Sequence, residues 1–292
     1  MSDLTGSVAF VTGGGSGIGR GVCERLARDG ADVFIADVDD AGAARTVDLV
    51  HQLGRRAANI HANVASKGHL QAAAAECVTQ FGRLDIAVAN AGIGRGASVL
   101  EMSLEDWQLQ LDINLTGVFL TVQAVGQQMV RLGHGGRIVC ISSLAAENTG
   151  AGIWSYSATK VGVRMMVRGW AQELGPHGIT VNAIGPGVID TPLAAGLAGE
   201  AGGRIRDNLE RATPVGRVGR PSDIAGLVSF MAGSDGEFMS GSYVIMDGGL
   251  RDARGAVRVG DAQDAEAEAE RARLLAAGAA RREQMRGWFE ER

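Results

Sequence analysis

Tyr156 and Lys160 are the residues of this sequence whose types and spacing are best suited to proton transfer. The 292-residue chain contains two tyrosines, Tyr156 and Tyr243, and two lysines, Lys67 and Lys160, so a pair four positions apart is unusual. On a helix, residues at i and i+4 share one face. A free phenol has a pKa of about 10, and a nearby ammonium lowers that pKa. The alternative is a half-buried tyrosine beside a surface lysine.

The segment TGGGSGIG, residues 12–19, has the character of a phosphate-binding turn. Gly13, Gly17 and Gly19 lack a Cβ, so the backbone can turn tightly and approach a pyrophosphate. The N-terminus of the helix that follows would offer free N–H groups. A glycine-rich turn alone is weak evidence, because any junction of strand and helix can use glycine. Its place after the first predicted strand strengthens the prediction.

Asp37 ends the second predicted strand, where a carboxylate can accept from the ribose hydroxyls of an adenosine. The same carboxylate would repel a 2′-phosphate, and Val38, Asp39 and Asp40 supply no cation to bind one. Ser16 in the glycine-rich turn supplies none either. These residues predict NAD rather than NADP as the cofactor. The alternative is a solvated aspartate at a strand end.

Seven short apolar runs alternate with stretches of helical spacing. The predicted strands are residues 8–12, 32–37, 57–64, 85–92, 136–143, 179–187 and 242–249. Helical spacing is visible in residues 18–28, 104–132, 156–174 and 222–232. Most strands are apolar on both faces, as in a parallel sheet covered on both sides. The pattern predicts an α/β fold, a doubly wound, Rossmann-like parallel sheet of seven strands with helices on both faces.

We predict one Rossmann-type domain over residues 1–250 and a separate C-terminal extension over residues 251–292. Within the domain, residues 192–220 form a long Gly/Ala-rich insertion, which we expect to be a substrate lid. The alternative is a surface excursion with its own helix. The extension is charged and Ala-rich, and its i,i+3 pairs of Glu and Arg predict a helix over about 261–286. Trp288 and Phe289 either dock on a subunit or belong to a disordered tail.

Composition and charge argue against several classes of protein. A hydrophobic content of 46% with 21% charged residues fits a globular protein with a sizeable core, and a net charge of −5 argues against a nucleic-acid partner. Cys23, Cys77 and Cys140 lie far apart, as in a reducing compartment, and the five histidines lack metal-ligand spacing. No signal peptide or membrane span is visible, so we expect a cytoplasmic protein without a membrane partner or metal.

Six motifs in register resemble the short-chain dehydrogenase/reductase family. They are residues 12–19, residues 90–92 (NAG), Asn114, Ser143, residues 156–160 (YSATK) and residues 186–191 (PGVIDT). The resemblance runs in order over residues 4–250 and implies a single-domain, NAD-dependent oxidoreductase. It would transfer a hydride reversibly between a secondary alcohol and NAD. The rival hypothesis is a non-catalytic NAD-sensing protein, which normally loses the tyrosine or the lysine.

The resemblance implies four catalytic residues, Asn114, Ser143, Tyr156 and Lys160. Tyr156 would be the general acid/base, and Lys160 would lower its pKa and bond the nicotinamide ribose. Ser143 would hydrogen-bond the substrate oxygen as charge builds on it. Ser143 is favoured over Ser142 by its spacing from Tyr156, and strand alternation points Ser142 to the other face. Asn114 would hold a water that passes protons from Lys160 towards solvent, or else make a local backbone bond.

The resemblance also implies the residues that contact NAD. Asn63 stands where the family usually has Asp, and its amide oxygen can still accept from the adenine amino group. Asn90 and Gly92 would approach the adenine-side ribose, and Thr191 the carboxamide of the nicotinamide. The full set is Gly13, Ser16, Gly17, Ile18, Gly19, Asp37, Asn63, Val64, Asn90, Gly92, Tyr156, Lys160, Pro186, Gly187 and Thr191.

Arg95, Glu147 and Trp154 are the residues predicted to contact the substrate. Arg95 beside Glu147 favours a small polar sugar, polyol or hydroxy compound, although both can equally be solvated loop charges. A 3-oxoacyl thioester is the second substrate class. The family usually forms tetramers through the helices that carry Asn114 and Tyr156, so a homotetramer is expected by resemblance.

Overall fold

Seven parallel strands form a single sheet. The computed structural model describes residues 2–194 and 202–253. The spatial order of the strands is β3-β2-β1-β4-β5-β6-β7, which confirms the predicted doubly wound α/β fold. The strands are β1 (Val8–Thr12), β2 (Asp32–Asp37), β3 (Ala57–His61), β4 (Ile86–Ala89), β5 (Gly136–Ile141), β6 (Ile179–Pro186) and β7 (Tyr243–Met246).

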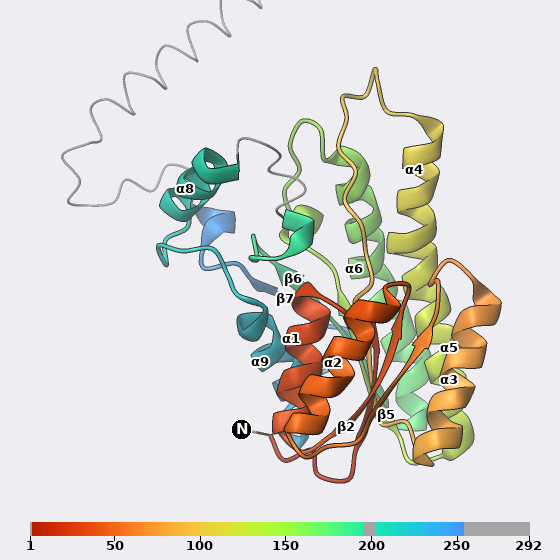
Figure 1. Cartoon of the computed structure of the whole chain (residues 1–292). Coiled ribbons are helices and arrows are strands. Elements are labelled where there is room, and N and C mark those ends of the chain that lie inside the picture. Colours follow the sequence, from red (N-terminus) through yellow and green to blue (C-terminus); the bar gives the residue numbers. More distant parts are fainter. Residues whose placement is uncertain (1, 195–201, 254–292) are drawn as a thin grey trace, which may run out of the picture. The chain divides into compact units, whose positions relative to one another are not determined.

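Helices cover both faces of this sheet (Figure 1). One face carries α1 (Gly17–Arg28), α2 (Asp40–Gln52) and α9 (Pro221–Ala232). The other carries α3 (Lys67–Phe81), α5 (Gly117–Leu132) and α6 (Trp154–Leu174). Two further helices are α4 (Leu104–Leu111), directly before α5, and α8 (Gly202–Ala212), between β6 and β7. Across residues 2–194 and 202–253, no helix is long and apolar enough to cross a membrane.

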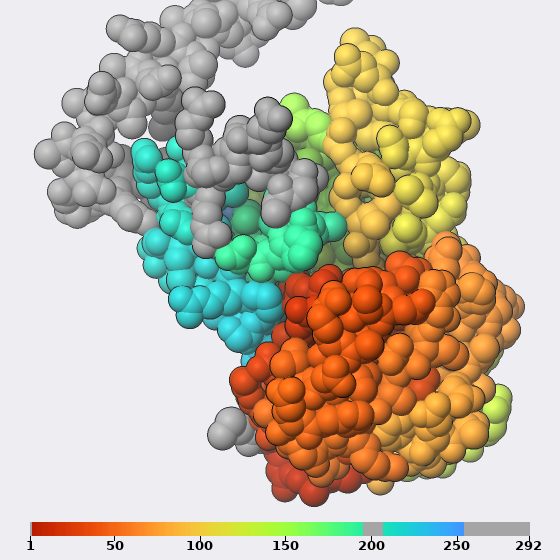
Figure 2. All heavy atoms as spheres, in the orientation of Figure 1, coloured from red at the N-terminus to blue at the C-terminus, as the bar shows by residue number. Residues whose placement is uncertain are grey.

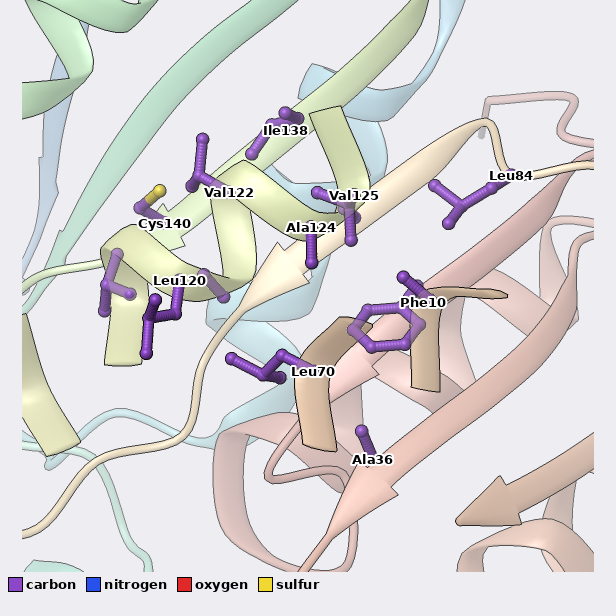
Figure 3. Packing of buried hydrophobic residues seen from close by; sticks show 14 of the residues in the cluster. Phe10, Ala36, Leu70, Leu84, Leu120, Val122, Ala124, Val125, Ile138 and Cys140 are labelled. Carbon is purple, nitrogen blue, oxygen red and sulfur yellow. The ribbon is translucent and has the colours of Figure 1, made fainter. Parts of the chain in front are cut away.

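Two layers of buried apolar side chains, one on each face of the sheet, hold the helices in place. In the layer under α3 and α5, Phe10 of β1 packs with Leu70 and Val125 of the helices (Figure 3). On the opposite face, Val11 of β1 packs in the layer that contains Leu26 of α1. Successive residues of a strand point to opposite faces, so the continuous apolar runs in the sequence supply both layers.

Several strands end earlier than their apolar runs predict. The predicted strands 57–64, 85–92 and 136–143 are shortened to 57–61, 86–89 and 136–141. After β4, the N–H of Asn90 donates to Thr12 Oγ1 (3.0 Å), a side-chain acceptor on β1, instead of continuing the strand ladder. The residues released in this way become the turns that surround the active-site region.

The helical stretch predicted over residues 104–132 contains one turn of π-helix. Residues Asp112–Thr116 form this turn, with α4 before it and α5 after it. π turns inside α-helices are rare and are frequent at functional sites. Here the turn contains Asn114, which is fully buried.

The insertion between β6 and β7 starts against the glycine-rich turn. A Cβ at Gly17 would lie 3.2 Å from Thr191 Cγ2, and Figure 2 shows this green segment beside the red N-terminal region. The insertion also contains α8, which both the lid and the surface-excursion hypotheses accommodate. The helix predicted over about 261–286 and the docking of Trp288 and Phe289 lie outside the described residues.

Candidate active site

A cavity of about 520 Å³ lies at the edge of the sheet where the parallel strands end. Most of the described residues that line it come from the ends of β1 to β6 and the turns that follow them, and Tyr156 and Lys160 come from α6. The strand order reverses between β1 and β4, and open α/β sheets bind ligands at such a reversal. The cavity is lined by every predicted cofactor residue except Gly19, and by the predicted catalytic residues Ser143, Tyr156 and Lys160.

The glycine-rich turn after β1 forms one end of this cavity. Gly13 has a φ of +67°, and a Cβ at this position would lie 2.9 Å from the Cα of Ala91. The Asn90 amide fixes the turn, because its Nδ2 donates to the carbonyls of Thr12 (2.9 Å) and Gly13 (3.0 Å). Ser16 precedes α1 without capping it through its side chain, so free N–H groups remain at the helix start. This cradle fits the pyrophosphate of a dinucleotide.

Asp37 lines the same end of the cavity from the last position of β2. Its Oδ2 accepts from Gly15 N (2.7 Å) and its Oδ1 from Asp39 N (2.9 Å), so backbone N–H groups fix the carboxylate. The nearby cation Arg20 was not considered from the sequence. Its guanidinium donates to the carbonyl of Gly15 and to Thr46 Oγ1, and it does not line the cavity.

Lys160 is buried, with 3% of its surface exposed, and its Nζ donates to the carbonyl of Ile141 (3.0 Å). Burial lowers the pKa of this ammonium to about 8, because charge is costly away from water. The ammonium lies 5.5 Å from the centroid of the Tyr156 ring, so the predicted i,i+4 pair faces one cavity.

The pKa of Tyr156 differs from the prediction. Burial raises it, and the group that opposes this rise is the Ser143 side chain, through a hydrogen bond. The expected lowering by Lys160 is therefore not the dominant effect in this structure. The physical reason is that desolvation of the phenolate outweighs an ammonium that sits over the ring and is already bonded to a carbonyl.

Ser143 follows β5 and begins a short 3₁₀ turn, Leu144–Ala146. Its Oγ accepts from Ala145 N (3.1 Å), which leaves the hydroxyl proton free to be donated to Tyr156. Its neighbour Ser142 donates instead to the carbonyl of Lys160 (2.9 Å), away from the phenol. The serine chosen from the spacing is thus the one that interacts with Tyr156.

Asn114 does not line the cavity but lies directly behind its wall. Its Oδ1 accepts from Ile93 N (2.8 Å) and its Nδ2 donates to the carbonyl of Ile93 (2.8 Å). These are long-range bonds to the loop after β4, and not the local backbone bond that was the alternative to holding a water. These bonds fix the loop after β4, whose residues line the cavity.

The three predicted substrate residues have different partners in the structure. Arg95 lines the cavity, and its Nε lies 3.4 Å from Asp106 Oδ1. Glu147 pairs with Arg164 (2.9 Å), and Trp154 stacks on Trp107 with ring centroids 5.7 Å apart. Neither Glu147 nor Trp154 is among the described lining residues. Much of the lining there is aliphatic. Ile93, Leu144, Ile153 and Val188 were not predicted, whereas Leu193 belongs to the segment predicted as a substrate lid.

Two polar residues near the site were missed from the sequence. Gln110 is buried, accepts from Arg95 N (3.2 Å) and donates to Ser155 Oγ (2.9 Å), which ties the loop after β4 to the start of α6. Tyr243 donates its phenolic proton to the carbonyl of Ser143 (2.6 Å). Its scarcity was a usable signal, because it is the second of only two tyrosines.

Comparison with known proteins places this geometry in a family. Residues 13–251 match the family model described as "Enoyl-(Acyl carrier protein) reductase". The chain is 41% identical over 246 residues to "Short-chain reductase protein NovJ" of Streptomyces niveus, covering 83% of this chain and 93% of that protein. It is 37% identical over 251 residues to "L-rhamnose 1-dehydrogenase (NAD(P)(+))" of Sphingomonas sp. (strain SKA58), covering 86% and 98% of the two chains.

Solved structures agree with this assignment. The 3-ketoacyl-(acyl-carrier-protein) reductase from Brucella melitensis, complexed with NADH, superposes with a TM-score of 0.79 at 29% identity. That match covers 85% of this chain and 99% of the other. The family model and the relatives span nearly the whole region that contains the sheet and the cavity. The chain therefore belongs to the short-chain dehydrogenase/reductase family.

Proposed function

We propose that this protein transfers a hydride reversibly between a secondary alcohol and NAD, with Tyr156 exchanging the proton. The observation that carries the proposal is the meeting of Tyr156, Ser143 and the buried Lys160 in one cavity. The other end of that cavity holds Asp37 and a glycine-rich turn shaped for a pyrophosphate. Binding of NAD by a non-catalytic sensor does not require Tyr156, Ser143 and Lys160 to lie together.

In the oxidative direction, the alcohol oxygen gives its proton to Tyr156 in its ionised form and accepts a hydrogen bond from Ser143. The C–H bond breaks and its electron pair departs with the hydrogen as a hydride, so the alcohol becomes a ketone; the bound nicotinamide supplies the acceptor for this hydride. The Ser143 hydrogen bond acts against the rise that burial causes in the pKa of Tyr156, and Lys160, with a pKa of about 8, is mostly charged at neutral pH and adds a nearby positive charge. In reduction, Ser143 stabilises the charge that develops on the oxygen, and Tyr156 returns the proton.

NAD is the proposed cofactor because the ribose end of the cavity carries a carboxylate. A 2′-phosphate would be repelled by the carboxylate of Asp37. Hydrogen bonds from the backbone N–H groups of Gly15 and Asp39 hold that carboxylate in place. Asn114 is proposed to support the reaction by fixing the loop after β4, and Arg95 to contact substrate at the cavity wall. The NADH complex of the Brucella melitensis reductase supports the same choice.

The proposed substrate is a small polar sugar, polyol or hydroxy compound. Arg95 supports it as a cation at the substrate end, and a relative carries the name of a rhamnose dehydrogenase. A 3-oxoacyl thioester is the second candidate, supported by the aliphatic wall around Leu144 and Ile153 and by the named activity of the Brucella melitensis protein.

A cytoplasmic homotetramer is the proposed form of the protein. Helices α5 and α6 leave Phe119, Val161 and Met165 exposed by 39%, 46% and 60%, and partner subunits would cover these side chains. Cys23, Cys77 and Cys140 are free thiols, as in a reducing compartment. Light scattering of the purified protein measures the number of subunits.

Replacing Tyr156 by Phe tests the proposed chemistry. The Tyr156→Phe variant should lose turnover by about 100- to 10,000-fold, since a positioned proton donor or acceptor is worth that much. Its affinity for NAD, measured by calorimetry, should stay within about twofold because the ring remains. The assay follows NADH formation with sugars, polyols, hydroxy acids and secondary alcohols, and NADH consumption with ketones and 3-oxoacyl thioesters. Turnover that survives in this variant would refute the role of Tyr156.

A further inference from the structure

We propose that Tyr243 is a positioning residue for Ser143: its hydroxyl holds the Ser143 main chain so that Ser143 Oγ faces Tyr156. The inference rests on the proposed function, because it assigns Tyr243 a task in the same reaction. Tyr243 lies outside the described lining of the cavity, and none of the six sequence motifs includes it.

The side chain of Tyr243 bridges three neighbouring strands. Tyr243 begins β7, the edge strand, and pairs with Ala183 of β6. Its phenol crosses β6 and donates to the carbonyl of Ser143 at 2.6 Å, a short hydrogen bond. Ser143 lies just beyond the end of β5. One side chain at the sheet edge thus fixes the backbone of the serine two strands away.

The sequence of β6 leaves room for this crossing. Ala183 and Gly185 lie two residues apart on β6 and therefore point to the face on which Tyr243 packs. A Cβ built at Gly185 would overlap the phenolic oxygen of Tyr243. Any larger residue at this position would push the hydroxyl off the Ser143 carbonyl, so the close approach requires glycine.

Arg164 holds the same assembly from α6. Its guanidinium lies 5.0 Å from the centroid of the Tyr243 ring, a cation–π distance, and it pairs with Glu147 at 2.9 Å. Glu147 ends the short turn that Ser143 begins. The backbone that carries Ser143 is therefore held at the start of the turn by Tyr243, and the end of the turn is held by Arg164 through Glu147.

The position of Ser143 has a measurable consequence at Tyr156. The hydrogen bond from Ser143 lowers the pKa of Tyr156 against the rise that burial causes. If Ser143 shifts, that opposing bond weakens, and the pKa of Tyr156 rises further. Lys160 over the Tyr156 ring is the charged group that faces it in the described structure.

Tyr243 itself stays protonated where the enzyme works, so it remains a hydrogen-bond donor. Burial raises its pKa to about 12. The charged groups that face it also act on this pKa, with Glu147 and Asp247 raising it and Arg164 and Arg251 lowering it.

Four proteins test the inference: wild type, Tyr243→Phe, Ser143→Ala and the double variant. The chain has two tyrosines, so tyrosinate absorbance reports Tyr156 alone in the proteins that carry Tyr243→Phe. In the other two proteins, a Tyr156→Phe reference gives the contribution of Tyr243, which is subtracted. The Tyr243→Phe change should raise the pKa of Tyr156 when Ser143 is present and leave it unchanged in the Ser143→Ala background. With the most active alcohol, kcat should fall roughly tenfold in Tyr243→Phe. This is smaller than the loss expected when an oxyanion donor is removed, because Ser143 is only displaced. KM and the affinity for NAD should not change.

Two further variants separate positioning from stability. Ser240→Ala removes another hydroxyl beside β7, one that accepts from Val181 N on β6 (3.2 Å), and should lower stability without moving the pKa of Tyr156. Gly185→Ala displaces the Tyr243 hydroxyl without deleting it, and should reproduce the pKa shift of Tyr243→Phe.

Three outcomes would overturn the inference. They are a Tyr243→Phe variant with only a lower melting temperature, an equal pKa shift in the Ser143→Ala background, and a Ser240→Ala variant with the same shift. An active Tyr156→Phe variant would instead refute the proposed function, and the tyrosinate titration would still show whether Tyr243 acts through Ser143.

Discussion

At the scale of single residues, the choice between NAD and NADP depends on the carboxylate of Asp37. Replacing it by Ser removes the charge that opposes a 2′-phosphate and a charged acceptor for the ribose hydroxyls. Hydrogen bonds to charged groups contribute about 1.5–3 kcal/mol, so the ratio of kcat/KM for NADP to that for NAD should rise by roughly 10- to 100-fold. Steady-state kinetics with both cofactors measures this ratio.

Asp40 provides a matched control for that substitution. It is another carboxylate near the end of β2, but its side chain is 66% exposed, it pairs with His61, and it does not line the cavity. Asp40→Ser should leave the cofactor ratio within about twofold, because exposed charges are screened by salt. An equal change in both variants would mean that net charge, and not contact with the ribose, sets the preference.

Lys160 should give the protein a pH-dependent stability that a second lysine does not share. Its pKa is about 8 when folded, against about 10.4 in an unfolded chain, so the folded state binds fewer protons between these values. The contribution of this residue to the unfolding free energy therefore rises as pH increases from about 8 to 10.4. Below about pH 8 the buried amine is charged, and the whole cost of burying that charge lowers stability. Relative to Lys160→Met, the wild type should gain unfolding free energy across that window.

Denaturant unfolding at several pH values measures the difference between the two proteins. Loss of the bond to the Ile141 carbonyl should shift the unfolding free energy of Lys160→Met by about the same amount at every pH. It should not account for a change of unfolding free energy with pH. Lys67→Met is the control, because Lys67 is exposed at the start of α3. The idea fails if both lysine variants show the same pH dependence relative to wild type.

At the scale of elements, the π turn between α4 and α5 carries Asn114 to the loop after β4. Asn114→Ala would remove both bonds to Ile93 and leave the N–H and the carbonyl of Ile93 without these partners. Unfolding free energy should fall by about 1–3 kcal/mol, and activity should fall with it because the loop lines the cavity. Gln108→Ala, which removes an exposed bond to Asp112 on the same helical segment, should cost under about 0.5 kcal/mol. Equal losses would contradict a specific role for Asn114.

The elements themselves were predictable because their patterns are local. Apolar runs on both faces predicted all seven strands, and the residues named from the motifs line one cavity at the edge where these strands end. The bounds of β1 and β2 were predicted, whereas β3, β4 and β5 end earlier than predicted. After β4, Asn90 leaves the ladder for a side-chain acceptor on β1, which the apolar run does not encode. The π turn was also invisible, because it differs from an α-helix by one hydrogen-bond step that no composition signal encodes.

At the scale of the whole molecule, the residues named for the cofactor line the cavity more completely than those named for the substrate. Cofactor residues follow strands in a fixed order, whereas the partners of Arg95 and Glu147 depend on how separate loops meet. Arg95 pairs with Asp106 of α4 and Glu147 with Arg164 of α6. The pKa of Tyr156 likewise depends on burial, a property of the assembled fold that the i,i+4 spacing alone does not contain.

The domain and the C-terminal extension should be separable. Residues 1–253 form one compact unit that contains the sheet, both apolar layers and the described cavity, and the family match ends at residue 251. A chain ended after Ala253 should therefore unfold cooperatively, bind NAD with unchanged affinity and keep kcat within about twofold. A chain ended after Glu237 is the control, because loss of β7 exposes the edge of β6 and should cause aggregation. If the Ala253 chain keeps its fold but its KM rises or its subunit number falls, residues 254–292 contribute to a neighbouring subunit, and the catalytic unit is larger than the single domain.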